Sequence, residues 1–347
     1  MKLRVGIVGI GPAWNSRHRA ALLALGDRFE VRAVCDPVAH RAEQVAAEFR
    51  ARAVDSFRSM AFCEDIDAVM LLSSRWFGAL PILAACDAGK AVYCAASLEL
   101  PAEEAAKLRD RVSHAGIAFM AEFPCRLAPA TLRLQELIAT RLGKPRLMFC
   151  NQRHIASREG GQPQAINTRQ LVEMVDWCRY VFGREATSVV STTHSSREDG
   201  AGDDYLIMML DFSDSGQVGT GPSAQIACGS YVPGQWKEAA AFRRPADLQV
   251  VCERGIAFID LPSTLVWFDR AGQHTEPLDS DRPVGEQLLM HFHRSVASLV
   301  LRSSSLDDAY RAMSIVIAAQ LSYAENRRVR CNVDGQCEDD PSGSLPR

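Results

Sequence analysis

The sequence lacks the features that mark several large classes of protein. No apolar run approaches the ~20 residues that a membrane span requires. The 39 basic and 42 acidic residues leave a net charge of −3, which gives no electrostatic reason to expect nucleic acid or a membrane as a partner. The chain begins a strand-like segment almost at once, so we also expect no secretory signal.

The eleven cysteines lack the spacing of a redox or metal motif, because none forms a Cys-x-x-Cys pair. Most of them lie in apolar stretches, where cysteine packs as a small hydrophobic residue. The sequence therefore predicts reduced thiols and a cytoplasmic location, with no disulfide and no metal site.

The N-terminal segment has the pattern of a dinucleotide-binding βαβ unit. An apolar strand at Leu3–Val8 precedes the turn Gly9-Ile10-Gly11, a helix follows over about 17–25, and a second strand at Val31–Cys35 ends at Asp36. In such a unit the glycines let the backbone approach a pyrophosphate, the helix N-terminus attracts its charge, and the acid binds a ribose hydroxyl. The alternative is an ordinary βαβ unit with a tight turn and no ligand.

The third glycine of the Gly-x-Gly-x-x-Gly fingerprint is absent, because Trp14 stands in its place. Trp14 is expected either to narrow the cofactor crevice or stack on a ring, or to pack in the core. Asp36 favours NAD, since a carboxylate repels a 2′-phosphate, whereas His40 and Arg41 nearby keep NADP possible. The cofactor-binding candidates are Gly9, Gly11, Pro12, Ala13, Trp14, Asp36, Ser73, Ser74 and Arg75.

Strands and helices alternate in the first third of the chain, which predicts a doubly wound parallel Rossmann sheet in a domain spanning 1–122. From about Phe123 the pattern changes to short strand-like runs with tight turns, as in antiparallel sheets. We therefore predict an α/β protein with a second, α+β domain at 123–330, built on a large open, mostly antiparallel sheet. A polar tail is expected at 331–347.

The chain resembles the Gfo/Idh/MocA family, which includes glucose-fructose oxidoreductase and inositol dehydrogenase. The resemblance rests on Val5–Leu25, Val31–Pro37, Asp67–Val69 with Ala88–Val92, Arg126–Pro129, Leu142–Pro145, Asp176–Gly183 and Ala318–Arg328. It implies an enzyme that oxidises or reduces a sugar-like or polyol hydroxyl with NAD or NADP. It also implies a homo-oligomer that pairs through the open C-terminal sheet.

The positions that carry acid–base chemistry in this family differ in the present chain. Ala95-Ala96-Ser97 replaces the family's Glu-Lys-Pro, and alanine has no proton to exchange. Ser73–Gly78 replaces a Thr-Pro-x-x-x-His loop. Arg169 and Glu173 stand where relatives carry Asp-x-x-x-His on a helix.

Three residues are candidates for the missing catalytic groups. Glu173 and Arg169 lie four apart on one helix face, so they form either an acid–base pair or an ion pair of small structural value. His154, at the start of a polar loop predicted over 152–167, either reaches the site or is a solvated loop histidine. Arg126 and Asp176 are candidates for substrate binding. For Arg126 the alternatives are a phosphate of the cofactor and an ion pair with a carboxylate across the two domains.

These observations predict an NAD(P)-dependent oxidoreductase that acts on a carbohydrate-like small molecule. Two alternatives remain open, namely a catalytically degraded dinucleotide-binding or regulatory protein and a redox-neutral, NAD-dependent glycoside-processing enzyme. The first alternative is consistent with the alanines at positions 95 and 96, whereas the second would still need a base.

Overall fold

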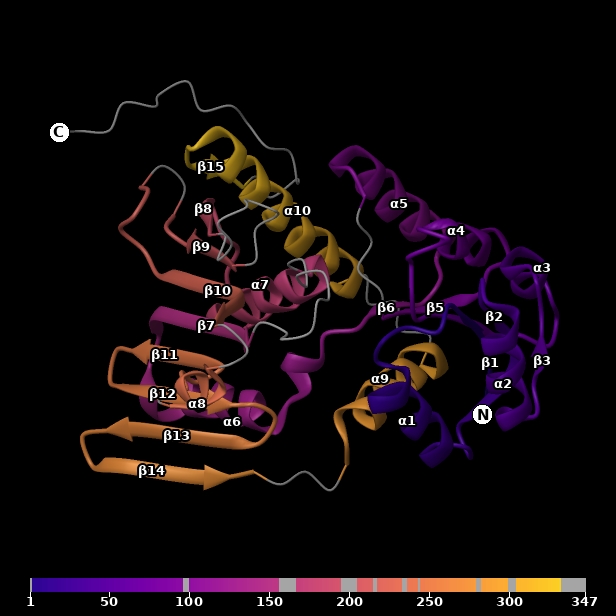
Figure 1. Ribbon diagram of the computed structural model, residues 1–347, viewed down its shortest axis with the longest axis horizontal. Coiled ribbons are helices and arrows are strands. Elements are labelled where there is room, and N and C mark those ends of the chain that lie inside the picture. Colours follow the sequence, from indigo (N-terminus) through magenta and orange to yellow (C-terminus); the bar gives the residue numbers. More distant parts are fainter. Residues whose placement is uncertain are drawn as a thin grey trace. The chain divides into compact units, whose positions relative to one another are not determined.

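The computed structural model describes residues 2–95, 100–155, 167–194, 205–214, 217–232, 236–242, 244–278, 282–298 and 304–331. The chain folds as two compact units (Figure 1), which are Met1–Pro124 with Asp281–Tyr310 and Cys125–Ser280 with Arg311–Arg347. The sequence pattern predicts one domain over 123–330. The structure differs at 281–310, because helix α9 (Val284–Ala297) packs against α1 (Arg19–Ala24) of the first unit.

Strands and helices alternate in the first unit, as its sequence pattern predicts. Besides α1 and α9, its elements are β1 (Leu3–Val8), a π-helical turn (Trp14–His18), β2 (Phe29–Cys35), α2 (Ala39–Phe49), β3 (Arg52–Ala53), α3 (Phe57–Ala61), β4 (Ala68–Leu71), α4 (Leu80–Asp87), β5 (Ala91–Cys94), α5 (Ala102–Ala115) and β6 (Phe119–Ala121). Its six strands pair in the order β3-β2-β1-β4-β5-β6, and every pair is parallel. Strands β4 and β5 are buried along their whole length, because helices cover both faces of such a sheet. The predicted doubly wound Rossmann sheet is therefore confirmed.

The second unit is built on one large sheet. Its elements are a 3-10 turn (Pro124–Leu127), α6 (Pro129–Leu137), a π-helical turn (Ile138–Leu142), β7 (Pro145–Ile155), α7 (Thr168–Phe182), β8 (Ser188–His194), β9 (Tyr205–Asp211), β10 (Ser223–Val232), α8 (Lys237–Ala241), β11 (Leu248–Cys252), β12 (Gly255–Asp260), β13 (Thr264–Asp269), β14 (Gly272–Pro277), α10 (Ser304–Glu325, whose first residues belong to the first unit) and β15 (Val329–Arg330). The nine strands follow the order β14-β13-β12-β11-β7-β10-β9-β8-β15.

This sheet confirms the predicted mostly antiparallel architecture. Strands β11 to β14 form a meander of antiparallel neighbours, visible as the orange arrows in Figure 1. The exception is the central pair, since β7 and β10 run parallel. Helix α7 contacts both of these central strands. Side chains of α7 therefore pack against those of the central strands β7 and β10, and this layer is where buried side chains of the unit contact one another.

Strand β7 is longer than the sequence predicts. The polar residues Asn151–His154 favour a loop by composition, yet each pairs with a residue of β10 in a regular parallel ladder. Backbone hydrogen bonds along that ladder outweigh the weak strand preference of these side chains. The predicted loop over 152–167 is thus wrong at 152–155, and its part at 156–166 lies outside the described residues.

The turn after β1 requires glycine for steric reasons. Gly9 has a φ of +71°, a conformation that side chains other than glycine rarely adopt. A Cβ on Gly11 would lie 2.2 Å from the carbonyl oxygen of Leu72, in the chain that leaves β4. Because that neighbour is backbone, it cannot move aside cheaply, and the two glycines hold the turn tightly against the end of β4.

None of the helices in the described part of the chain combines the length and the apolar character that crossing a bilayer requires.

The close approach at Gly11 gives a stability prediction. Gly11→Ala is expected to destabilise the protein by at least about 2 kcal/mol, because the added Cβ forces the turn away from the Leu72 backbone. Gly26→Ala is the matched control, since the nearest atom to its added Cβ is the Leu23 oxygen at an ordinary 3.5 Å. Urea unfolding of the two variants measures the difference, and equal midpoints would contradict the steric argument.

Candidate functional site

Asp36 is tied to the glycine turn in the first unit. Its Oδ2 accepts a hydrogen bond from the backbone N–H of Ile10 at 2.7 Å, and its Oδ1 accepts one from Val38 at 3.0 Å. The carboxylate therefore lies at the end of β2 beside the turn, as the dinucleotide pattern predicts. Each oxygen accepts one backbone bond and retains a lone pair that a ribose hydroxyl can use.

Two neighbours of the turn affect what it can bind. The guanidinium of Arg41 donates to the carbonyl oxygen of Ile10 at 2.7 Å, so a cation lies beside the same turn as Asp36. Trp14 is only 5% exposed and packs edge-on against Phe49, with ring centroids 5.8 Å apart. Of the two roles considered for Trp14, the structure therefore favours packing.

The other predicted cofactor residues lie after β4. Ser73 touches the glycine turn, since a Cβ on Gly9 would lie 2.6 Å from its carbonyl oxygen. The carbonyl of Ser74 accepts a hydrogen bond from the backbone N–H of Gly78 at 2.8 Å, which closes a turn. The guanidinium carbon of Arg75 lies over the ring of Trp76, 5.7 Å from the ring centroid. Gly9, Gly11, Ser73 and Asp36 are thus brought together at the carboxyl ends of β1, β2 and β4, where α/β sheets bind their ligands.

This arrangement fits a dinucleotide. The turn has no side chains at Gly9 and Gly11 that would keep a phosphate away, and the helical turn that follows Ala13 presents N–H groups at its N-terminus. A carboxylate for a ribose lies at the end of β2. Three residues, Ala95, Ala96 and Ser97, stand where the resembled family carries Glu-Lys-Pro. Ala95 is buried at the end of β5, and the other two lie outside the described residues.

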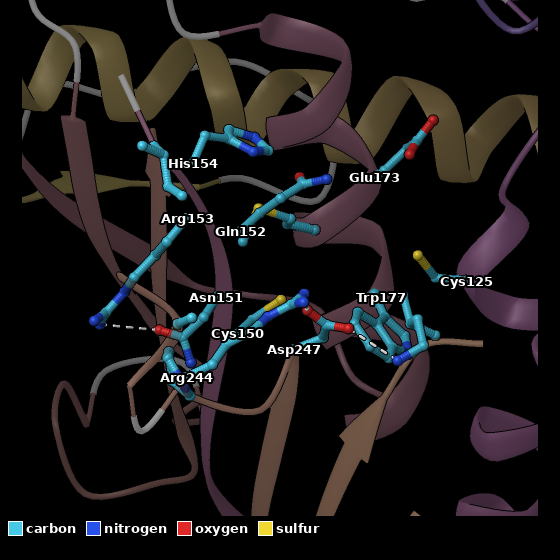
Figure 2. A pocket seen from close by; sticks show the side chains of 15 residues that line it. Cys125, Cys150, Asn151, Gln152, Arg153, His154, Glu173, Trp177, Arg244 and Asp247 are labelled. Atoms are coloured by element: carbon cyan, nitrogen blue, oxygen red, sulfur yellow. Dashed lines mark hydrogen bonds and ion pairs between the residues drawn. The ribbon is translucent and has the colours of Figure 1, made fainter. Parts of the chain in front are cut away.

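A pocket of roughly 780 Å³ lies in the second unit, between the end of β7, α7 and the segment before β11. Figure 2 shows its side chains, with Glu173 and His154 on different sides and Gln152 between them in this view. Its lining consists of Cys125, Cys150, Asn151, Gln152, Arg153, His154, Ile155, Glu173, Met174, Trp177, Ala241, Arg244, Pro245, Asp247 and Leu261. The pocket thus brings together two of the three predicted catalytic residues.

Helix α7 positions Glu173. The helix begins after Asn167, whose side chain accepts a hydrogen bond from the N–H of Arg169, and it ends at Gly183 with φ of +63°. The guanidinium of Arg169 donates to Oε1 of Glu173 at 2.8 Å, and each of the two side chains is about one-fifth exposed. The i,i+4 ion pair considered as the alternative is therefore formed, and it lies partly buried at the pocket wall.

His154 reaches the same pocket from β7. Alternation along the strand places Cys150, Gln152 and His154 on one face. That face is directed toward α7, because Nε2 of His154 lies 3.5 Å from the side-chain amide of Gln170. His154 therefore belongs to a regular strand of the sheet rather than to the loop in which the sequence analysis placed it.

Arg126 and Asp176, the predicted substrate residues, bind each other. The guanidinium of Arg126 donates to both carboxylate oxygens of Asp176, with Nε 2.7 Å from Oδ2, and Arg179 adds a contact at 3.3 Å. The Asp176 side chain is 1% exposed. Arg179 is held in turn by two 2.7 Å hydrogen bonds to Glu185. This geometry favours a structural role, and the carboxylate that Arg126 holds comes from its own unit.

The cysteines behave as core residues. The ten cysteines in the described ranges are free thiols, and seven of them are buried. A hydrogen bond with Cys178 and complete burial raise the pKa of Cys150 well above its usual value, so it lines the pocket as a neutral thiol. The described ranges contain no group of three or more His, Cys, Asp or Glu side chains suited to a metal ion.

Sequence reasoning missed several residues of the pocket. Trp177 forms part of its wall and is fixed by a 3.0 Å hydrogen bond from its indole N–H to Thr131. Asp247 is fixed by the backbone N–H of Leu261, which donates to its Oδ2 at 2.8 Å. Residues 150 and 247 lie close together because β7 pairs with β11, and no pattern in the local sequence of either strand predicts that pairing. Gln152 could have been found from the sequence, because in a strand it lies on the same face as His154, two residues further on.

Comparison with known proteins agrees with this geometry. Residues 3–123 match a family model described as an oxidoreductase family with an NAD-binding Rossmann fold. Among curated proteins, the chain is 27% identical to inositol 2-dehydrogenase 3 of Saccharopolyspora erythraea over 63% of this chain and 65% of that protein. It is 30% identical to an inositol 2-dehydrogenase of Acidothermus cellulolyticus over 54% of this chain and 55% of that protein. The matched region thus spans about half to two thirds of these relatives.

Solved structures share the fold of the whole chain. A levoglucosan dehydrogenase in complex with NADH and levoglucosan superposes with a TM-score of 0.78 at 18% identity, covering 95% of this chain and 100% of that one. A putative myo-inositol dehydrogenase from Sinorhizobium meliloti gives a TM-score of 0.72 at 21% identity, also covering 95% of this chain and 100% of that one. At these identities the likeness establishes the two-unit fold.

The burial of Asp176 gives a prediction that separates structure from substrate binding. Asp176→Asn is expected to lower the free energy of unfolding by about 3–5 kcal/mol, because it leaves Arg126 and Arg179 without their shared carboxylate. Asp214→Asn is the control, since its ion pair with Arg184 is exposed and is expected to contribute less than about 1 kcal/mol. Denaturant titration of both variants measures this, and a fully stable Asp176→Asn variant would favour a direct role in substrate binding.

Glu185 gives a prediction for acid stability. Burial alone would raise the pKa of Glu185, but Arg179 and Arg311 outweigh it and hold the pKa below its ordinary value. A carboxylate with a depressed pKa stabilises the fold above its ordinary pKa of about 4.3 and loses that contribution as the pH falls. The melting temperature of Glu185→Gln should therefore depend less on pH than that of the unaltered protein between about pH 5 and 3. Parallel curves would argue against the ion pairs.

Proposed function

We propose that this chain, a member of the Gfo/Idh/MocA family of oxidoreductases, is an NAD(P)-dependent dehydrogenase that acts on a sugar-like or polyol hydroxyl. The observation that carries the proposal is the half-buried Glu173 carboxylate, held by Arg169 in the wall of a polar pocket. The first unit would bind the dinucleotide, and the second would bind the substrate. Its relatives by sequence include enzymes named as inositol 2-dehydrogenases.

The first unit would hold the cofactor through the turn at Gly9–Ala13, through Asp36 and through Ser73. Asp36 would accept a ribose hydroxyl, which favours NAD. Arg41 lies beside the same turn and could bind a 2′-phosphate, so binding of NADP is the competing outcome. Ser74 and Arg75 follow on the same loop and would border the site, whereas Pro12 and Trp14 shape the turn.

When bound, the nicotinamide supplies the hydride acceptor, and the chain's own groups have to manage the proton. Oxidation of a secondary alcohol breaks a C–H bond, whose electron pair leaves as hydride, and an O–H bond, whose proton goes to a base. We assign that base to Glu173. Arg169 binds Oε1 of the carboxylate, which orients it and leaves Oε2 to accept the proton.

The lining of the pocket supports a polyhydroxylated substrate. Gln152 offers an amide and His154 an imidazole, both of which pair with hydroxyl groups, whereas the amide of Asn151 is bonded to Ala246 and Arg153. Trp177 also lines the pocket, but at 2% exposure it forms part of the wall rather than a surface for a sugar ring. His154 is the second candidate for proton transfer, since a neutral imidazole can also accept the alcohol proton.

A catalytically degraded binding protein is the competing function, and Ala95 at the end of β5 is the observation that favours it. It would bind the dinucleotide without turning over any alcohol. A redox-neutral glycoside-processing enzyme would also bind NAD, but it would release a sugar without net reduction of the cofactor. Following NADH absorbance and sugar release in parallel distinguishes the three functions.

We also propose a homo-oligomer through the C-terminal sheet. Val190 of β8 and Met209 of β9 are opposite each other in the antiparallel ladder, and both keep more than a third of their surface exposed. Paired apolar side chains on an open sheet face favour contact with another sheet. A cytoplasmic location, inferred from the reduced thiols, stays a prediction.

Two measurements test the enzymatic proposal. Titration with NADH should quench tryptophan fluorescence, and a panel of cyclitols and sugars with NAD should yield NADH. Glu173→Gln is expected to lower kcat by about 10²–10⁴-fold with unchanged NADH affinity, because the amide cannot accept the proton. Glu136→Gln is the control, since that exposed carboxylate pairs with Arg133 outside the pocket. Full activity of Glu173→Gln would remove Glu173 as the base, and loss of NADH binding by the unaltered protein would refute the whole proposal.

A further inference from the structure

A buried carboxylate in the first unit has no part in the chemistry described so far. Glu122 directly follows β6, and its side chain is completely buried. Its Oε2 accepts a hydrogen bond from the Tyr93 hydroxyl at 2.7 Å and lies 2.7 Å from Nε2 of His18. Its Oε1 forms an ion pair with Arg17. The four side chains, which we call the Glu122 cluster, join the end of the π-helical turn to β5 and to the end of β6.

The Glu122 cluster is energetically demanding, which makes it unlike an incidental surface contact. Moving a carboxylate out of water costs several kcal/mol unless donors surround it, and here three side chains supply them. His18 is 1% exposed, and the Arg17 side chain is only one-quarter exposed. Loss of the carboxylate would leave these donors buried without their acceptor, so the cluster fixes the positions of Arg17 and His18.

The backbone transmits this constraint to the glycine turn. The N–H of Trp14 donates to the carbonyl of Gly11 at 3.1 Å. The carbonyl of Ala13 accepts from the N–H groups of Arg17 and His18, at 3.0 and 3.2 Å. These hydrogen bonds, together with the peptide bond between Ala13 and Trp14, connect the turn with the two residues that Glu122 holds.

Helix α9 supports the cluster from its other side. A Cβ on Gly285 would lie 2.8 Å from Cγ of Arg17, so this glycine lets the helix approach the arginine stem. Phe292 packs edge-on against Tyr93 with ring centroids 5.4 Å apart. Arg17 and Tyr93 are thus held both by Glu122 and by α9, which restricts the freedom of the segment after the turn.

We propose that Glu122 is a positioning residue for the dinucleotide. By holding Arg17 and His18, it keeps the turn Gly9–Ala13 and the N–H groups that follow in the arrangement that binds the pyrophosphate. The inference rests on the proposed binding of a dinucleotide by this unit. It adds that the pyrophosphate part of the ligand depends on Glu122, whereas the adenosine part depends on Asp36, which is bonded to Ile10 and Val38 and lies outside the cluster.

Two ligands that differ in the pyrophosphate test this division. ADP-ribose carries the pyrophosphate and adenosine does not, and both can be titrated in competition with NADH. Glu122→Gln is expected to weaken binding of ADP-ribose and NADH by about tenfold or more, and that of adenosine by less than about twofold. A general loss of stability would weaken all three ligands alike, so the split is a readout that a purely structural role would not produce.

Asp67→Asn is the matched control. The carboxylate of Asp67 accepts hydrogen bonds from the backbone N–H of Arg4 at 2.8 Å and from the Arg4 guanidinium at 3.0 Å. Asp67 precedes β4 at the amino ends of the strands, whereas the glycine turn lies at their carboxyl ends. The variant is expected to be less stable and to bind ADP-ribose and adenosine as before. If it shows the same split as Glu122→Gln, the assignment to Glu122 is overturned.

Tyr93→Phe covers the case in which Glu122→Gln does not fold. It removes one donor to the carboxylate and keeps the ring against Phe292, so a smaller split in the same direction is expected. Equal weakening of ADP-ribose and adenosine in a folded variant would overturn the inference alone. Failure of the unaltered protein to bind either ligand would overturn the proposed function together with the inference.

Discussion

The structure depends on one constraint, which is that a carboxylate removed from water must be surrounded by donors. Both units contain such groups, for example Glu122 in the first and Asp176 in the second, and neither of these two side chains is more than 1% exposed. Both collect arginines from distant parts of the chain, Arg17 for the former and Arg126 for the latter. An unmet charge in either place would cost more than most single contacts contribute, so the elements that supply the donors have little freedom to move.

The burial of each strand explains which strands the sequence predicts and which it does not. The first unit was predictable because β4 and β5 are apolar and buried along their whole length, as burial on both faces of a parallel sheet requires. In the second unit β14 was missed, since Gly272–Pro277 is polar and lies at the edge of the sheet. Strand β7 lies in the centre of the sheet, but its last residues are also polar, and they owe their conformation to the ladder with β10. Local sequence carries no record of such pairing.

The sequence identified individual residues of the candidate site, but it did not show which of them contact each other in the fold. Glu173 and Arg169 could be paired because a helix places residues four apart side by side. Arg126 and Asp176 are 50 positions apart, and His18 and Glu122 are 104 apart, so their meeting follows only from the completed fold. The sequence identifies Asp176 as a candidate for substrate binding. In the structure its side chain is buried, and its carboxylate accepts hydrogen bonds from Arg126 and Arg179.

The π-helical turn at Trp14–His18 changes how the absent third glycine should be understood. A π turn contains about one residue more than an α turn, and that extra residue rotates the side chains after it by about 100° around the helix axis. The third glycine of the fingerprint permits close packing of a regular helix against the strand. Here the helix begins as a π turn at Trp14, so the side chains that the extra residue rotates are those after Trp14, and His18 at the end of the turn contacts Glu122. Neither Ala13 nor Asn15 is a glycine, so the missing third glycine belongs to a local departure from the regular helix rather than to a shift in spacing.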